Sequence, residues 1–347
     1  MKNIVNLAFF FTCCTSFAQS PFIDSIYQIV VPGFEKAYNG AIYPHEDGYL
    51  LTFRDHHFID DDEGVWEKLR FRSGIVKLDS FFNICGEPQV LEELNWRGYD
   101  PRFIKIKEDL YLVYTSPGPD ADDLTYQAKI YIAKLSRHEN GRFHLEKEIH
   151  LQFKNANFAE KNWIPFCYED QLYLTYMLRP HRVLKADLGT GKCEEVYATR
   201  SGVRWYWGAL LGGSQLQLCD EGFLGIFHSK RASEKGFNHY YAGAYILSPT
   251  PPFAIIRHSV VPFEHPDFYS TDSFVKKILN MRCIFPLGIA LKGEKIVVSY
   301  GESDAAIKLM VLDKKKLLEG MRVTKYQKTV DFLKKPSGIF CKEFTTG

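Results

Sequence analysis

A short polar turn followed by an alternating apolar strand recurs five times along the chain, and this repeat constrains the fold more than any other feature. Copies follow one another at intervals of about 50 to 70 residues, within the range of propeller blades with insertions. A second strand follows each copy, whereas a two-sheet sandwich would not give matched pairs at this spacing. The first strands span 45–53, 108–116, 169–177, 220–228 and 292–300, and the second strands span 74–79, 130–136, 183–188, 241–248 and 307–313. The repeat predicts an all-β chain in which residues 22–313 form a five-bladed β-propeller with four strands in each blade.

Composition agrees with one large β domain. The 347 residues are 46% hydrophobic and 15% aromatic, which is enough for an extensive core rich in strands. The formal net charge of +1 gives no reason to expect a nucleic-acid partner.

The N-terminus has the pattern of a secretory signal peptide. Lys2 precedes an apolar run from Ile4 to Phe11, and Ser16-Phe17-Ala18 fits the small-x-small rule for cleavage before Gln19. A buried first strand is the alternative reading of this run, which is too short to span a membrane. We expect residues 1–18 to be removed, no transmembrane segment elsewhere, and a secreted or periplasmic location.

Cysteine spacing leaves the oxidation state open. Cys13 and Cys14 would leave with the signal peptide, and six widely spaced cysteines remain, with no C-x-x-C among them. Export permits disulfides, but buried free thiols are the favoured reading for a chain with this much core.

The C-terminal residues 314–347 differ from the repeats. They begin with a lysine-rich, weakly amphipathic stretch, KKKLLEGMRVTKYQKTVDFLKK. This predicts a tail that is helical in part and that closes or braces the propeller.

Polar segments next to the inner strands define the candidate site. In a propeller these segments converge on one mouth of the central channel. Before the second repeat stands Tyr99-Asp100-Pro101-Arg102, where Pro101 holds Asp100 on an extended or turning backbone. We expect Asp100 to be the reactive acid. A structural turn with a local ion pair is the alternative.

Other repeats bring polar and aromatic residues to the same position. Arg54 follows an inner strand, and Lys161, Asn162 and Trp163 precede one. Amides bond sugar hydroxyls and aromatic faces stack on sugar rings, so Asn162 and Trp163 are candidate sugar contacts, although core packing would also explain Trp163. The acidic run at residues 60–63 matches neither an EF-hand nor a zinc spacing, so no metal site is expected.

An ordered set of motifs resembles glycoside hydrolase family 130, the β-mannoside phosphorylases and related β-mannosidases, which are five-bladed propellers. The resemblance extends over about residues 39–312. The matching segments are Asn39-Gly-Ala with Phe53-Arg54, Tyr99-Asp100-Pro101-Arg102, Lys161-Asn162 with Leu178-Arg179-Pro180, Gly222 to His228, Tyr241 to Leu247, Phe285 to Gly288 and Tyr300 to Asp304.

The resemblance implies an inverting reaction at a β-mannoside. Asp100 matches the family's general acid, which protonates the leaving oxygen through the sugar's own 3-hydroxyl. Inorganic phosphate would be a possible co-substrate, and no cofactor is expected. The positions that match phosphate-binding residues are Arg54, Lys161, Arg179 and His228, and those that match the sugar subsite are Asn39, Arg102, Tyr241 and Asp304.

Several features leave hydrolysis open beside phosphorolysis. Tyr99 stands where the family usually has Glu, and Lys161 stands where phosphorylases tend to carry a second Arg. The predicted export also argues against phosphorolysis, because a cell gains little from a sugar phosphate that is made outside it. Hydrolysis would need a carboxylate to activate water, for which Glu160 and Glu302 are the candidates. A furanosidase-type hydrolase would need a close carboxylate pair, here Asp100 with Glu160.

We therefore expect a secreted carbohydrate-active enzyme that cleaves β-mannosides or similar glycans with inversion, with Asp100 as general acid. The alternative from another class is a non-catalytic, glycan-binding propeller that has kept the fold. An oligosaccharide is the expected partner in both cases.

Overall fold

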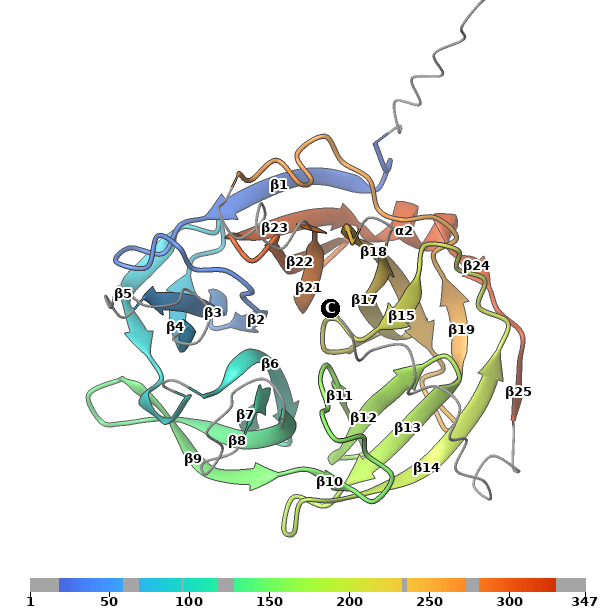
Figure 1. The fold of residues 1–347 in the computed structure, drawn as a ribbon, viewed down its shortest axis with the longest axis horizontal. Coiled ribbons are helices and arrows are strands. Elements are labelled where there is room, and N and C mark those ends of the chain that lie inside the picture. The colour runs from blue at the N-terminus through green and yellow to red at the C-terminus, as the bar shows by residue number, and fades with distance from the viewer. Residues whose placement is uncertain are drawn as a thin grey trace, which may run out of the picture.

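The computed structural model describes residues 19–58, 69–94, 97–117, 128–232, 236–272 and 281–328. Strands make up most of this part of the chain, and they pair into sheets that surround a central axis in a propeller-like ring (Figure 1). The signal-peptide prediction, the acidic run at 60–63, Cys13, Cys14 and Cys341 lie outside the described residues.

The topology contains five sheets, numbered here in chain order. The first holds β2 (Ile42–His45), β3 (Gly48–Phe58), β4 (Leu69–Leu78) and β5 (Ile84–Val90). The second holds β6 (Tyr99–Ile106), β7 (Asp109–Ser116), β8 (Lys129–Arg137) and β9 (Phe143–His150). The third holds β10 (Gln152–Phe153), β11 (Ile164–Tyr168), β12 (Gln171–Leu178), β13 (His181–Ala186), β14 (Lys192–Ser201) and β25 (Tyr326–Lys328).

The fourth sheet is the largest. It holds β15 (Ala209–Leu211), β16 (Gln217–Cys219), β17 (Gly222–Ala232), β18 (Asn238–Leu247), β19 (Ile255–His258), β20 (Met281–Arg282) and β24 (Arg322–Val323). The fifth holds β21 (Ile284–Lys292), β22 (Lys295–Glu302), β23 (Ala306–Asp313) and the N-terminal β1 (Ile23–Ile29). Two helical segments complete the described elements, the 3-10 turn η1 (Glu92–Leu94) and the helix α2 (Lys314–Gly320).

The predicted all-β, propeller-like architecture is confirmed, and the ten predicted strands form. The expectation of five four-stranded blades is wrong as stated, because only three sheets have four strands while the third has six and the fourth seven. The additional members, such as β15, β16, β20, β24 and β25, are two or three residues long. Strands this short cannot be predicted from alternation of apolar and polar residues, because two or three residues hardly repeat the two-residue pattern.

Antiparallel pairing brings the candidate residues to one mouth. In the first, second and fifth sheets the inner strands β2, β6 and β21 run antiparallel to β3, β7 and β22. The start of each inner strand therefore lies beside the end of the strand that follows it. Figure 1 shows β2, β6, β11 and β21 nearest the axis. Segments far apart in sequence, such as those around residues 39, 100 and 304, therefore meet.

Apolar side chains fill the interfaces between neighbouring sheets. Leu50 packs in one cluster with Leu112, joining the first and second sheets, and Leu51 packs with Ile307, joining the first and fifth. Comparable clusters join the remaining neighbours. Burial between sheets is what fixes their relative positions, because no hydrogen-bonded ladder joins one four-stranded sheet to the next.

Both ends of the described chain pair with outer strands. β1 runs antiparallel to β23 and completes the fifth sheet. The tail starts with α2, whose N-cap Asp313 accepts a hydrogen bond from the Lys316 backbone N–H, and continues as β24 against β19 and β25 against β14. Only residues 314–320 of the described tail are α-helical. The two tail strands belong to different sheets, β24 to the fourth and β25 to the third.

The five cysteines among the described residues are free thiols. Cys193 and Cys283 are buried, Cys167 and Cys219 are partly buried, and Cys85 is exposed. For these residues the free-thiol reading is correct, although only two of them are fully buried. Within the same part of the chain, no helix is both long and apolar enough to cross a membrane.

Candidate active site

One amide joins two carboxylates that are far apart in sequence. Asn39 Nδ2 donates to Asp100 Oδ1 at 3.2 Å and to Asp304 Oδ1 at 3.1 Å. Asp100 lies in β6 of the second sheet, Asn39 in the segment before β2 and Asp304 in the turn between β22 and β23, and Asn39 and Asp304 are 265 residues apart. A primary amide carries two N–H donors, so one side chain can bond to both carboxylates. We call Asp100 and Asp304 the carboxylate pair, and Asn39, whose amide bonds to both, its bridge.

The backbone is left-handed at every member of this group. Positive φ angles occur at Asn39 (49°), Asp100 (55°), Asn162 (59°) and Asp304 (48°). Asn and Asp tolerate this region better than other non-glycine residues, but it still costs energy that the surrounding structure must compensate. Of the thirteen non-glycine residues with positive φ in the described part of the chain, these four are candidate site residues.

Glycine is required beside the bridge. A Cβ at Gly301 would stand 1.7 Å from Asn39 Oδ1. The amide can therefore reach both carboxylates only because residue 301 has no side chain.

Two cations lie beside Asp100 and over the same ring. Arg54 Nη1 is 3.4 Å from Asp100 Oδ1, and the guanidinium stands over Tyr38 at 5.1 Å and Tyr99 at 4.8 Å. Lys161 Nζ is 5.4 Å from the centre of the Tyr99 ring. Tyr99, noted from the sequence only as a departure from the family, thus holds both cations without adding a negative charge.

Electrostatics differ between the two carboxyls and their surroundings. Burial raises the pKa of Asp304, the charge of Asp100 raises it further, and Arg54 and the Asn39 hydrogen bond oppose the rise. Desolvation lowers the pKa of Lys161, against the attraction of Asp100. A like-charged pair beside two cations is the kind of group that changes protonation when its partners change.

Arg102 connects three sheets from a buried position. Its side chain donates to Gly213 O at 2.6 Å, to Asp100 O at 3.0 Å and to Asn162 Oδ1 at 2.9 Å. The residue is 2% exposed, and burial lowers its pKa to about 10, so it stays charged at neutral pH. The predicted sugar contacts Arg102 and Asn162 are thus joined to each other and to the backbone of Asp100.

His228 is enclosed by aromatic rings. It lies 4.8 Å from Phe285 and 5.8 Å from Tyr240, and it is 1% exposed. Burial lowers the pKa of His228 to about 3, so its ring is neutral at pH 7. The backbone of Gly212 is a hydrogen-bond partner of the ring, so as a phosphate contact His228 would offer no positive charge.

Tyr240 faces the carboxylate pair, and Tyr241 does not. Asp304 and Cys283 are among the charges that act on Tyr240, whereas Arg231, Glu264 and Arg282 act on Tyr241. Tyr241 stacks on His239 at 4.0 Å. Neighbouring residues of a strand point to opposite faces, so Tyr240 rather than Tyr241 lies on the side of Asp304, and sugar binding by Tyr241 stays a prediction.

Trp163 and Glu160 bond to each other. Trp163 Nε1 donates to Glu160 Oε2 at 3.0 Å, and Asn157 and Tyr176 bond to the other oxygen of the same carboxylate. Trp163 is 2% exposed and lies edge-on to Tyr176. The structure therefore places the candidate sugar contact Trp163 in the core and occupies both oxygens of Glu160.

Glu302 is occupied as well. Lys308 Nζ is 3.0 Å from its Oε2, and the backbone N–H groups of Tyr269 and Thr271 also donate to the carboxylate. This fully buried group fixes the segment around Tyr269, whose hydroxyl donates to Tyr240 O at 2.9 Å. Its role in the structure is to hold that segment and the turn that leads to Asp304.

Arg179 lies apart from the other candidate cations. It is exposed in the turn between β12 and β13, where the second strand of the third sheet ends. Among the residues that the structure describes, none makes an ion pair or hydrogen bond with it.

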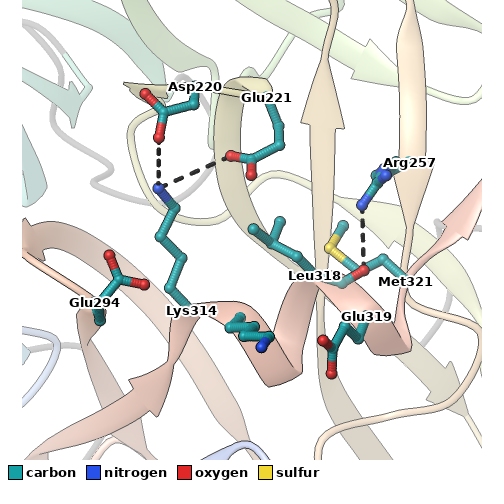
Figure 2. Close-up of a pocket in the computed structure, with 9 residues that line it drawn as sticks. Asp220, Glu221, Arg257, Glu294, Lys314, Leu318, Glu319 and Met321 are labelled. Carbon is teal, nitrogen blue, oxygen red and sulfur yellow. Dashed lines mark hydrogen bonds and ion pairs between the residues drawn. The ribbon is translucent and has the colours of Figure 1, made fainter.

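A cavity of about 450 Å³ lies away from the candidate residues, at the β16–β17 and β21–β22 turns and against α2 (Figure 2). Within it, Lys314 Nζ is 3.2 Å from Asp220 Oδ2 and 3.9 Å from Glu221 Oε2. None of the candidate residues lines it.

Solved structures share this architecture. No family model matches the chain, and no curated protein matches it significantly. A structure described as belonging to the family 130 mannoside phosphorylases, and as a glycoside hydrolase that targets β-1,2 mannosidic linkages in Candida mannan, aligns with a TM-score of 0.57 at 15% identity, over 85% of this chain and 91% of that one. The fold is that of glycoside hydrolase family 130.

Two further family 130-like structures agree with this assignment of the fold. The β-1,2-mannobiose phosphorylase from Listeria innocua, in complex with β-1,2-mannobiose, aligns with a TM-score of 0.56 at 14% identity, over 86% of this chain and 94% of that one. A mannose phosphorylase from Leishmania mexicana, in complex with phosphate ion, aligns with a TM-score of 0.55 at 12% identity, over 86% and 91% of the two chains. The motif-level resemblance is confirmed for the fold.

Proposed function

We propose that this chain is a carbohydrate-active enzyme that cleaves β-mannosides with inversion, with Asp100 as general acid and inorganic phosphate as acceptor. The supporting observation is the carboxylate pair with its bridge, flanked by Arg54 and Lys161 at one mouth of the ring. Shared fold with structures described as mannoside phosphorylases supports the substrate class. In this proposal each of the five sheets is one blade.

The chemistry requires one proton and one nucleophile. Asp100 protonates the leaving sugar oxygen through the 3-hydroxyl of the mannosyl unit, and a phosphate oxygen attacks the anomeric carbon from the opposite face. The bond from that carbon to the sugar oxygen breaks, and a bond to phosphate forms. Arg54 and Lys161 hold the anion, because a phosphate dianion in a partly desolvated site needs fixed positive partners.

The remaining candidates receive roles that fit their positions. Asn39, Asp304 and Asn162 bind the mannosyl hydroxyls, Arg102 fixes Asn162 and Asp100, and Tyr240 lies beside Asp304. His228 is an uncharged contact of phosphate, and Arg179 would contact it from the rim.

Hydrolysis is the second candidate, supported by the predicted export signal and by the hydrolase activity stated for one structure of the same fold. It needs a carboxylate that is free to activate water. Both oxygens of Glu160 and of Glu302 are bonded within the protein, so neither carboxylate is free to activate water. Phosphorolysis is therefore the better supported of the two. A secreted or periplasmic location remains part of the proposal.

Turnover of a β-mannoside panel by the protein, with and without phosphate, tests the proposal. Asp100→Asn keeps the size of the side chain and an acceptor for Asn39, so it should lose turnover while keeping the fold. Asp109→Asn is the matched control, since Asp109 bonds Lys134 at the far end of the same sheet. We expect phosphate-dependent release of a mannosyl phosphate that Asp100→Asn abolishes and Asp109→Asn retains.

Other products would contradict parts of the proposal. Free mannose released without phosphate would establish the hydrolase, and a product of retained configuration would make Asp304 a nucleophile. Glycan binding without turnover in either condition would support the binding propeller.

A further inference from the structure

The carboxylate pair is surrounded by a small set of charges. Among the residues that the structure describes, the cations acting on it are Arg54 from β3, Arg102 from β6 and Lys161 from the segment before β11. Three cations thus face two carboxylates, and the group carries about one net positive charge when both carboxyls are ionised.

The other titratable groups at the mouth stay neutral. They are Tyr38, Tyr99, Tyr240 and Cys283, whose pKa values burial raises, and His228, whose pKa burial lowers to about 3. Because these five groups are uncharged at neutral pH, the two carboxyls carry the negative charge on which a bound anion acts.

Arg54 interacts with Asp100 and is also the proposed ligand of phosphate. Its guanidinium is 3.4 Å from Asp100 Oδ1 and stabilises that carboxylate. The same guanidinium is the proposed phosphate ligand. A dianion bound beside Arg54 and Lys161 would both occupy the counter-charge of Asp100 and reverse the net charge of the group, and each change favours the neutral form of a carboxyl.

We propose that binding of a phosphate dianion beside Arg54 and Lys161 draws a proton from solvent onto the Asp100–Asp304 pair, so that the nucleophile itself brings the general acid into its protonated form. The inference rests on the proposed function and adds to it a link between the two substrates of the reaction. Asn39 can accommodate the proton on either residue, because a protonated carboxyl still has an oxygen to accept from the amide.

The proton is conserved over one cycle. It enters with phosphate, passes from Asp100 to the leaving sugar oxygen through the 3-hydroxyl, and departs on the new hydroxyl of that sugar. The proton that the phosphate dianion itself carries returns to solvent when the mannosyl phosphate ionises, so the cycle consumes no net proton. Asp100 is then ionised again and returns to Arg54 when the mannosyl phosphate leaves. Burial raises the pKa of Asp304, which favours the protonated form of the pair.

Calorimetry of phosphate binding to the intact protein measures this proton directly. The binding enthalpy is recorded at one pH in several buffers of different ionisation enthalpy, and its slope gives the number of protons taken up. Phosphate itself exchanges protons on binding, but that contribution is common to all variants. We expect the wild type to take up between about half and one proton more per bound phosphate than Asp100→Asn or Asp304→Asn.

Asp109→Asn is the control and should match the wild type. Thermal melts identify any variant that fails to fold, and the two carboxyl variants serve as independent probes. Equal proton numbers in the wild type and in both folded carboxyl variants would overturn the inference. If phosphate-dependent turnover is then still observed, only the inference fails. Absence of both phosphate binding and phosphate-dependent turnover would refute the inference together with the proposed phosphorylase activity.

Discussion

Replacing Arg102 by Lys tests whether this residue is the main link between the sheets at the mouth. Arg102 makes three hydrogen bonds, one within β6 and two to the segments beside the third and fourth sheets, and Lys lacks the fork of donors that reaches all three acceptors. A hydrogen bond to a charged group contributes about 1.5 to 3 kcal/mol, so the loss of two should lower the free energy of unfolding by about 3 kcal/mol. In a domain of this size that corresponds to a fall of roughly 4 °C in Tm.

Urea unfolding and thermal melts of the Arg102→Lys protein measure the loss. Arg204→Lys is the control, because Arg204 is exposed and its substitution should change stability by less than about 0.5 kcal/mol. A change below about 1 kcal/mol in Arg102→Lys would refute the reasoning, since the three bonds would then contribute no more than one ordinary hydrogen bond. Turnover should fall as well, because Arg102 also holds the Asp100 carbonyl.

Two further predictions follow from buried groups. Glu160→Gln should lower the free energy of unfolding by about 1 to 3 kcal/mol, because the Glu160 carboxylate holds Trp163. The variant should retain at least half of the wild-type turnover, because this carboxylate does not activate water. A loss of turnover without a loss of stability would restore Glu160 as a base. Burial lowers the pKa of His181 to about 3, below its unfolded value near 6.5, so the unfolded state binds the proton first and stability is lost as pH falls through this window. Urea unfolding between pH 7.5 and 4.5 should therefore show a slope that is smaller by up to about 1.4 kcal/mol per pH unit in His181→Asn; identical slopes would contradict the assignment.

The sequence repeat is sufficient to predict the main strands and to predict that the polar segments next to the inner strands lie close together. Alternation identified the second and third strands of every sheet, because these are long and buried on both sides of their interfaces. The rule that segments next to inner strands converge then placed Asn39, Asp100 and Asp304 together, which the shared amide hydrogen bonds bear out. Their roles in binding and catalysis remain predictions.

Side-chain direction and partners were beyond the sequence. The choice between Tyr240 and Tyr241 depends on which face of β18 each residue occupies, and two adjacent tyrosines give no alternation from which to decide. Glu160 and Glu302 looked like candidate bases because their partners, Tyr176 and Lys308, come from other strands. Trp163 was open to both readings until its burial excluded an exposed sugar platform.

The seam between β1 and β23 has a consequence for the time at which the molecule can become active. Asn39 is made early and Asp304 late, and the two meet only when the fifth sheet has joined the first. A partly synthesised chain that stops before residue 304 therefore holds Asp100 and Arg54 without the second carboxylate, whatever fraction of its sheets has already folded. Under the proposed function such a chain is inactive, so activity would follow completion of the polypeptide.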